Sequence, residues 1–221
     1  MDNKQLLIYK DIHKKILTLH YKPNEALSER KLSNHYSTSR TTVRQVLQKL
    51  TIEKKILILP RSKTIIPKIS LQKIKEYVIL RNCLEQTMAV IVSDKLKKND
   101  YKFLQENINN QKKILKLSSK SKIAKFIKLD NNFHRYLFKV AGLNNLWVTI
   151  QEYIFDYDRT RYLSVFDYQR AEVTTREHYK IFTSLKKNNK IQIKKNIQIH
   201  FNNASKYTFS VLVKKNKEYF I

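Results

Sequence analysis

Apolar residues recur at helical spacing through the first 50 residues and predict three helices. The first apolar stripe runs from Ile8 to Leu19, so a first helix is expected to end before Pro23. Ser28 and Ser39 are of the residue type that caps helix N-termini, and each precedes a further apolar stripe. A second, short helix and a third helix are therefore expected after these two serines.

Two short β-rich runs follow the third predicted helix. Residues 56–59 and 64–66 are rich in isoleucine and leucine, and the turn-forming sequence Pro-Arg-Ser-Lys separates them. Three helices followed by a small hairpin predict a winged helix-turn-helix.

Proline and glycine are unevenly distributed and indicate where this first domain ends. All three prolines lie in the first 67 residues, and the remaining 154 residues contain no proline and only Gly142. Such a stretch is typical of long helices joined by short polar turns. Helices are expected at roughly 70–93, 99–117, 121–141, 144–163, 171–188 and 190–214. The predicted fold is mainly α, with a winged helix-turn-helix at 1–69 and an all-helical bundle domain at 70–221.

The overall charge favours an anionic partner but does not locate it. The chain has 45 basic and 18 acidic residues, a formal net charge of +27. Residues 1–67 carry 14 of the basic and 5 of the acidic residues, so the charge density is nearly equal in the two predicted domains. A hydrophobic content of 42% excludes an intrinsically disordered chain. The single cysteine and the absence of a long apolar run predict a soluble cytoplasmic protein.

The start of the third predicted helix has the chemistry of a DNA-reading element. A capped helix N-terminus offers free backbone N–H groups to a phosphate. Arg40 and Arg44 lie one turn apart, and arginine can bind guanine through two parallel hydrogen bonds. Thr41 and Thr42 are small enough for close approach to the duplex. The alternative is a solvated basic helix of an ordinary helical domain.

This region resembles the GntR family of bacterial transcription regulators. The resemblance rests on an ordered set of residues: Leu27 to Arg30, Leu32, Ser39 to Arg44, and Leu47 to Leu50. The resemblance implies a set of DNA-contacting residues in the second and third helices and in the wing: Arg30, Ser39, Arg40, Thr41, Thr42, Arg44, Arg61 and Lys63. The sequence departs from the family where Asn24, Ser37, Lys54 and Lys63 replace a usual glycine.

Three of the six histidines combine with an aspartate into a pattern. Asp130 and His134 are four residues apart, hence on one helical face, where they can share a metal ion. His178 and His200 lie 22 residues apart on two helices joined by a short turn, which can bring both imidazoles to one level. The alternative for any single histidine is a surface or core residue, and we keep that interpretation for the other three, His13, His20 and His35.

A GntR winged helix followed by a helical domain resembles the FadR subfamily, whose C-terminal FCD domain binds an effector. The subfamily pattern falls on Asp130, His134, His178 and His200 and implies a divalent metal, Zn²⁺, Ni²⁺ or Mn²⁺, with a position open for a metabolite carboxylate. Arg81 is the best candidate to bind that carboxylate, and an ion pair with Glu85 is its alternative. Asn203 and Arg161 are weaker effector-binding candidates.

These observations predict a metabolite-responsive transcription regulator, not an enzyme, that binds a palindromic DNA operator as a homodimer. A small carboxylate effector would change the placement of the two winged helices. Two alternatives remain open. One is a metal-dependent hydrolase that uses the His/Asp site, with Glu177 as a conceivable base. The other is a non-specific nucleic-acid-binding protein driven by its positive charge.

Overall fold

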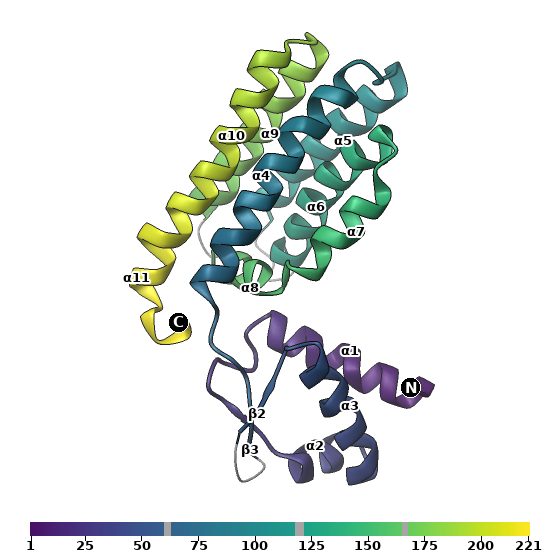
Figure 1. Ribbon diagram of the computed structural model, residues 1–221, viewed down its shortest axis with the longest axis vertical. Helices are drawn as coiled ribbons and strands as arrows, with labels where there is room; N and C mark the ends of the chain where they lie inside the picture. Colours follow the sequence, from purple (N-terminus) through teal and green to yellow (C-terminus); the bar gives the residue numbers. More distant parts are fainter. Residues whose placement is uncertain (60–62, 118–121, 165–167) are drawn as a thin grey trace. The chain divides into compact units, whose positions relative to one another are not determined.

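The computed structural model describes residues 1–59, 63–117, 122–164 and 168–221, and it divides into two compact units (Figure 1). One unit comprises Met1–Leu71 together with Lys215–Ile221, and the other comprises Gln72–Lys214. The predicted fold class is confirmed: most described residues are helical, and a small sheet lies in the first unit.

The first unit has the helices and strands of a winged helix-turn-helix. Its elements are α1 (Asn3–Leu17), β1 (Ala26–Leu27), α2 (Glu29–His35), α3 (Arg40–Ile52), β2 (Leu57–Leu59) and β3 (Lys63–Ile65). Ser28 and Ser39 cap α2 and α3, as predicted, because each hydroxyl accepts a backbone N–H of the first turn. The apolar stripes of α1 and α3 are buried and pack against each other.

The sheet of this unit has one strand more than the sequence pattern predicts. The strand order is β1-β3-β2, and both pairings are antiparallel. Strand β1 has two residues, Ala26 and Leu27, which pair with Ile65 and Thr64. A two-residue strand is too short for an alternating pattern, so only its pairing with the hairpin reveals it.

The C-terminal segment belongs to the first unit, whereas the predicted range 70–221 assigns it to the helical domain. The backbone N–H of Ile69 donates to the carbonyl of Tyr219 at 2.8 Å, and the N–H of Ile221 donates to the carbonyl of Ile69 at 3.0 Å. These bonds form an isolated parallel bridge between Ile69 and Phe220, and the Phe220 side chain is buried. Backbone pairing of this kind leaves no signal in residue composition.

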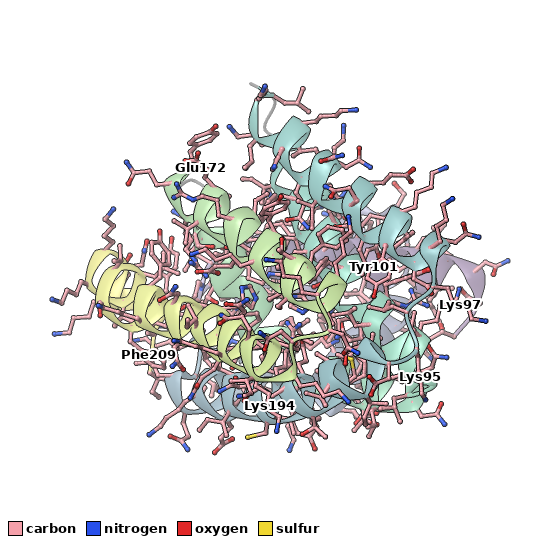
Figure 2. The ribbon with its side chains drawn as sticks, turned by 90° about the horizontal axis from the view of Figure 1, so that it is seen from above. Lys95, Lys97, Tyr101, Glu172, Lys194 and Phe209 are labelled. Carbon is pink, nitrogen blue, oxygen red and sulfur yellow. The ribbon has the colours of Figure 1, made fainter. Side chains whose placement is uncertain are left out.

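The second unit is a bundle of helices. They are α4 (Leu71–Ser93, which starts at the last residue of the first unit), α5 (Lys98–Leu115), α6 (Lys122–Ala141), α7 (Asn144–Glu152), α8 (Phe155–Ser164), α9 (Tyr168–Lys186) and α10 (Lys190–Tyr207). Helix α5 packs against α6 and α9, and α9 packs against α10. Figure 2 shows the molecule with its side chains drawn, and charged residues such as Lys194 on α10 lie at the surface.

Two predicted helices of this unit differ from the structure. The predicted helix 144–163 is two helices, because the chain leaves helical hydrogen bonding at Tyr153 and Ile154, where neither proline nor glycine signals a break. The predicted helix 190–214 continues after Tyr207 as a π-helical turn, Thr208–Leu212, before the short helix α11 (Val213–Lys215). The remaining predicted helices of this unit match within a few residues.

Three of the positions where the family usually has glycine adopt left-handed backbone conformations. The φ angles are 65° at Asn24, 45° at Ser37 and 57° at Lys54. Asparagine tolerates the left-handed region better than most residues, because its short polar side chain can hydrogen-bond to the nearby backbone. Within the described residues, the lysine side chain makes no such local hydrogen bond, so the steric contact between its Cβ and the backbone is not offset. Lys54 therefore holds local strain just after α3.

We expect the substitution Lys54→Gly to stabilise the first unit. Glycine removes ~1–2 kcal/mol of left-handed strain and costs ~0.5–1 kcal/mol of chain entropy, which leaves a gain of up to about 1.5 kcal/mol. Native-state hydrogen exchange of the α3 amides measures the change. The control Gln48→Gly, at an exposed position within α3, should instead lose about 0.5–1 kcal/mol. Equal losses in both variants would contradict the strain at Lys54.

Candidate functional site

The N-terminus of α3 presents the predicted DNA-contacting residues to solvent. The Ser39 hydroxyl accepts the backbone N–H of Thr42 at 3.1 Å, so the cap fixes the first turn. Arg40 and Thr41 are exposed on that turn, Thr42 is half-buried, and Arg30 is exposed on α2. The structure thus places these residues on the outside of the helix-turn-helix.

Arg44 is held by a partner on the preceding helix. Its Nε and Nη2 atoms donate to the two carboxylate oxygens of Glu29 at 3.1 and 2.9 Å. These hydrogen bonds hold the pKa of Glu29 below its usual value. The Arg44 side chain is still 61% exposed. Glu29 therefore fixes the direction of the guanidinium while leaving it accessible, a role that the sequence pattern does not reveal.

The two predicted wing residues have different outcomes. Lys63 is exposed at the start of β3, where it pairs with Leu59. Arg61 lies outside the described residues.

The structure brings three of the predicted metal ligands together inside the helical unit. His134 lies on α6, His178 on α9 and His200 on α10, and all three side chains are buried. Within the described part of the chain, these residues form a group that could hold a metal ion, with one ligand atom from each all within 4.8 Å of one another. His13, His20 and His35 lie in the first unit, outside this group.

Each imidazole of the cluster has a hydrogen-bond partner at Nδ1. The partner of His134 is Glu85 on α4, at 2.5 Å. Gln111 on α5 lies 2.8 Å from Nδ1 of His178, and Glu177 lies 2.8 Å from Nδ1 of His200. The cluster is thus surrounded by hydrogen-bond partners from three helices.

The unpartnered ring nitrogens of the cluster fit a metal ion. The Nε2 atoms of His134 and His178 are buried and have no hydrogen-bond partner within the described residues. A buried polar atom without a partner costs free energy, and a coordinated cation would remove that cost. Burial lowers the pKa of both His134 and His178, which keeps the imidazoles in the neutral form that binds metals.

Asp130 is close to the cluster but is not a member of that tight group. Its Oδ1 atom lies 3.5 Å from Nε2 of His178, while Oδ2 accepts from Arg161 at 2.6 Å. Burial alone would raise the pKa of Asp130, but the charge of Arg161 outweighs burial and holds this pKa below its usual range. An ionised carboxylate therefore stands beside the three imidazoles.

A cavity of about 60 Å³ adjoins the cluster. Its lining includes Asp130, His200, Arg161 and Arg170. One water molecule needs ~10–15 Å³ of such space, so the cavity can hold a few waters or a small ligand. The lining mixes polar and apolar side chains, and both of its arginines are paired with carboxylates, Arg161 with Asp130 and Asp158 and Arg170 with Glu177.

The three predicted effector-binding residues have different surroundings. Arg161 lines the cavity and is bonded to Asp130, Asp158, Asn131 and a backbone carbonyl. Arg81 is buried outside the cavity lining, and its Nε donates to Glu85 at 2.6 Å, as in the alternative considered for it. Asn203 also lies outside the lining and donates to Glu177 at 2.8 Å.

Sequence reasoning missed most of the residues that surround the histidines. Glu85 was visible as a residue four positions after Arg81, and Glu177 as the neighbour of His178, but neither pattern shows which histidine it contacts. Gln111 and the cavity residue Arg170 carry no signal at all in the sequence. Packing of α5 against α9 brings Gln111 into place.

Fold and site together define a class of protein. A winged helix with an exposed arginine-bearing helix N-terminus is joined in one chain to a helical unit with a histidine cluster and an adjoining cavity. This is the organisation of a winged-helix DNA-binding protein with a separate helical domain.

Comparison with known families identifies both parts. Residues 4–66 match the family described as bacterial regulatory proteins, gntR family, and residues 77–203 match the FCD domain. Because the FCD match alone covers more than half of the chain, the protein belongs to the FCD-containing GntR regulators, as the resemblance predicted.

Two curated relatives illustrate the similarity. The chain is 27% identical over 180 residues to the HTH-type transcriptional repressor RspR of Escherichia coli (strain K12), which covers 81% of this chain and 78% of that protein. It is 25% identical over 210 residues to the uncharacterized HTH-type transcriptional regulator YdhC of Bacillus subtilis (strain 168). This alignment covers 94% of this chain and 92% of that protein. The names of these relatives describe regulators of transcription.

Solved structures agree with the fold. McbR/YncC of E. coli superposes with a TM-score of 0.70 at 15% identity and covers 97% of this chain and 99% of its own. A GntR regulator of Rhodococcus sp. RHA1 has the same TM-score at 14% identity, and the superposition covers 95% of this chain and 99% of that one. Among the described residues, no helix is both long and apolar enough to span a membrane.

Proposed function

We propose that this protein is a metabolite-responsive transcription regulator of the FadR subfamily that binds a palindromic operator in the cytoplasm as a homodimer. The observation that carries the proposal is the exposed N-terminus of α3, where Arg40 and the oriented Arg44 stand one turn apart on a winged helix. In this proposal a small carboxylate, bound near a metal ion in the helical unit, changes the affinity for the operator.

The proposed DNA contacts divide by chemistry. Arg40 and Arg44 reach base edges in the major groove, where a guanidinium can bind guanine bidentately. Arg30, Ser39, Thr41 and Thr42 contact the backbone and fix the register. The wing residues Arg61 and Lys63 reach the minor groove beside them.

The proposed metal site uses the three clustered histidines with Asp130 as a fourth ligand. The Nε2 atoms of His134 and His178, which have no hydrogen-bond partners within the described residues, support this assignment, and Oδ1 of Asp130 lies 3.5 Å from Nε2 of His178. Three imidazoles and one carboxylate suit Zn²⁺, Ni²⁺ or Mn²⁺. When bound, the ion supplies a Lewis acid that attracts a carboxylate oxygen of the effector.

The proposed effector lies in the cavity next to His200. Arg161 lines this cavity and already binds Asp130 and Asp158, so an effector carboxylate would share its guanidinium with them. The proposed roles of Arg81 and Asn203 need the effector to reach beyond the present lining. The small cavity volume favours a short carboxylate over a bulky ligand.

The hydrolase alternative has less support. The carboxylate of Glu177 is buried and paired with His200, Asn203 and Arg170, an arrangement that positions the His200 ring. The relatives are named as regulators. We therefore propose a non-enzymatic role for the histidine site.

A selection of operator sequences from random duplex DNA tests the proposed function. The expected result is a palindrome with two half-sites, preferred over unrelated DNA by several kcal/mol at physiological salt. Binding without sequence preference that weakens uniformly as salt rises would instead establish the charge-driven alternative.

Helix α4 offers a surface for the proposed homodimer. Ile79 and Ile91 are exposed to 53% and 39% on this helix, and Cys83 is exposed between them. Spacings of four and eight residues place the three on one side of the helix. Apolar residues that share one exposed face mark a protein contact more often than isolated ones do.

We expect the double substitution of Ile79 and Ile91 by glutamate to weaken dimerisation by more than about 100-fold, because two charges per chain would be buried without partners. Sedimentation velocity at micromolar protein measures the change. The control is Ile191→Glu, at a position on α10 that is 84% exposed, and it should leave the dimer intact. A wild type that is monomeric and binds one half-site as tightly as the palindrome would contradict the proposed homodimer.

A further inference from the structure

We infer that a directional hydrogen-bond relay on α5, formed by Asn107 and Gln111, sets the tautomer of His178 and thereby prepares the histidine cluster for a cation. The inference deepens the proposed metal site and rests on it for its functional meaning. The relay itself is a property of the metal-free protein, so it can be tested separately.

The relay starts at a backbone carbonyl, which can only accept. Nδ2 of Asn107 donates to the carbonyl oxygen of Leu129 at 3.1 Å, so the amide oxygen of Asn107 must face the other way. That oxygen accepts from Nε2 of Gln111 at 2.7 Å. The amide oxygen of Gln111 is then the atom that faces Nδ1 of His178, at 2.8 Å.

An amide oxygen next to an imidazole nitrogen requires a proton on that nitrogen. Nδ1 of His178 must therefore carry the ring proton, which leaves the lone pair on Nε2. Gln111 is fully buried, so water cannot replace it as the partner of the ring. The ring plane is fixed as well, because Phe133 stacks on His178 with a centroid separation of 4.4 Å.

Carboxylates impose the same tautomer on the other two histidines. Glu85 and Glu177 can only accept while ionised, so Nδ1 of His134 and of His200 must donate to them. Burial would raise the pKa of Glu85, but the charge of Arg81 and the hydrogen bond from His134 outweigh it and hold the pKa below its usual value. Arg81 therefore acts on the cluster through Glu85, as a positioning residue.

The consequence is a cluster whose three Nε2 lone pairs are available before any ion arrives. No tautomer exchange is then needed for coordination, which lowers the cost of binding. Helix α5 contributes no ligand in this arrangement, yet it determines which nitrogen of His178 is available.

A competing tautomer of His178 makes the relay testable. Asp130 lies 3.5 Å from Nε2 and could accept a proton placed there, whereas Gln111 lies at 2.8 Å from Nδ1. Without Gln111 as an acceptor, the proton should move to Nε2 and face Asp130. The lone pair would then point away from the cluster, and a cation would have to displace the proton.

The experiment compares the wild type with Gln111→Leu and Asn107→Leu. Long-range ¹H–¹⁵N spectra of the metal-free proteins, recorded at about pH 8, distinguish protonated from bare ring nitrogens. Competition with a chelator measures the affinity for Zn²⁺. The matched control is Gln105→Leu, because Gln105 and Asn109 form a similar amide pair four residues apart on an exposed part of α5.

We expect Nδ1–H on all three histidines of the wild type and of Gln105→Leu. Gln111→Leu should move the proton of His178 to Nε2 and lower the Zn²⁺ affinity by ~10–100-fold, the usual effect of losing such a partner. Asn107→Leu frees the Gln111 amide to rotate and should give a mixture of tautomers with a smaller loss. The conservative substitution Gln111→Glu keeps an acceptor next to the ring, so His178 should retain its proton on Nδ1.

The outcomes separate the relay from the proposed function. A wild type with the expected tautomers that binds no Zn²⁺ would support the relay and remove the metal from the proposed function. A wild-type His178 protonated at Nε2 would overturn the relay even if Gln111→Leu failed to fold. Unchanged tautomers and Zn²⁺ affinity in a folded Gln111→Leu would overturn it as well.

Discussion

Replacement of His178 by alanine is expected to lower the affinity for Zn²⁺ by more than about 100-fold, since losing a mere hydrogen-bond partner of a ligand already costs ~10–100-fold. His178 is fully buried and supplies one of the two Nε2 atoms that have no hydrogen-bond partner in the described structure. The same result is expected for His134→Ala and His200→Ala. Asp130→Asn should have a smaller effect, because this carboxylate stands apart from the tight group.

Loss of the ion should also appear in the stability of the protein. A ligand at 100 times its Kd stabilises the folded state by about 2.7 kcal/mol, provided that it binds only this state. Thermal melts of chelator-treated and Zn²⁺-reloaded protein should differ accordingly in the wild type. This difference should vanish in the three alanine variants. The comparison within each variant cancels the cost of the substitution itself.

The control for this series is His20→Ala, which changes an exposed histidine of the first unit. It should leave both the metal content and the Zn²⁺-dependent stabilisation unchanged. One ion per chain in all three cluster variants after reloading, or no ion in the reloaded wild type, would leave the histidines as core residues. Effector binding would then have to be explained without a metal.

The fold was predictable from the sequence where local signals and packing agree. Ser28 and Ser39 cap helices whose apolar stripes are buried, so pattern and cap point to the same boundaries. The break between α7 and α8 at Tyr153 and Ile154 was not predictable, because no helix-breaking residue marks it. Only the packing of the surrounding helices can decide between one long helix and two short ones there.

The sequence predicted the histidines of the site but not the residues that surround them. Histidine spacing and the family resemblance led to His134, His178 and His200, which the structure brings together. Amides carry no comparable signal: Asn107 with Gln111 and Gln105 with Asn109 have the same spacing on one helix, yet only the first pair is buried against a histidine. The difference is a rotation about the helix axis, which tertiary packing sets.

The four-residue spacing of Arg81 and Glu85 is compatible with either an exposed or a buried ion pair. The pair could have been exposed, with little energetic weight. In the structure both side chains are 1% exposed, and Glu85 also contacts His134. Removal of one partner of such a buried pair leaves the other charge uncompensated, so Arg81 matters to the cluster whether or not it contacts an effector.

Substitution of Arg40 or Arg44 by alanine is expected to weaken specific operator binding by about 1–3 kcal/mol each and to relax the preference at the contacted base pairs. Both side chains are exposed, so the fold should be unaffected. Fluorescence anisotropy with the selected palindrome and with a scrambled duplex measures the specific and the non-specific affinity separately.

Glu29 provides a sharper test of how Arg44 works. Its carboxylate receives two hydrogen bonds from the guanidinium, so Glu29→Gln should remove the orientation while keeping the size of the side chain. If Arg44 reads a base, this variant should lose specificity although it gains one unit of positive charge. If Arg44 only attracts phosphates, the same variant should bind every duplex more tightly.

If binding depended on net charge alone, substitutions that remove one positive charge would weaken DNA binding equally wherever they lie. The control Lys194→Ala removes one positive charge from an exposed position on α10 in the helical unit (Figure 2). It should leave operator binding nearly unchanged, whereas Arg40→Ala removes the same charge from the proposed reading helix. Because the net charge of the two variants is equal, any difference between them must come from position. Equal losses of affinity in both, on specific and scrambled DNA alike, would show that the charge of +27 rather than α3 determines binding.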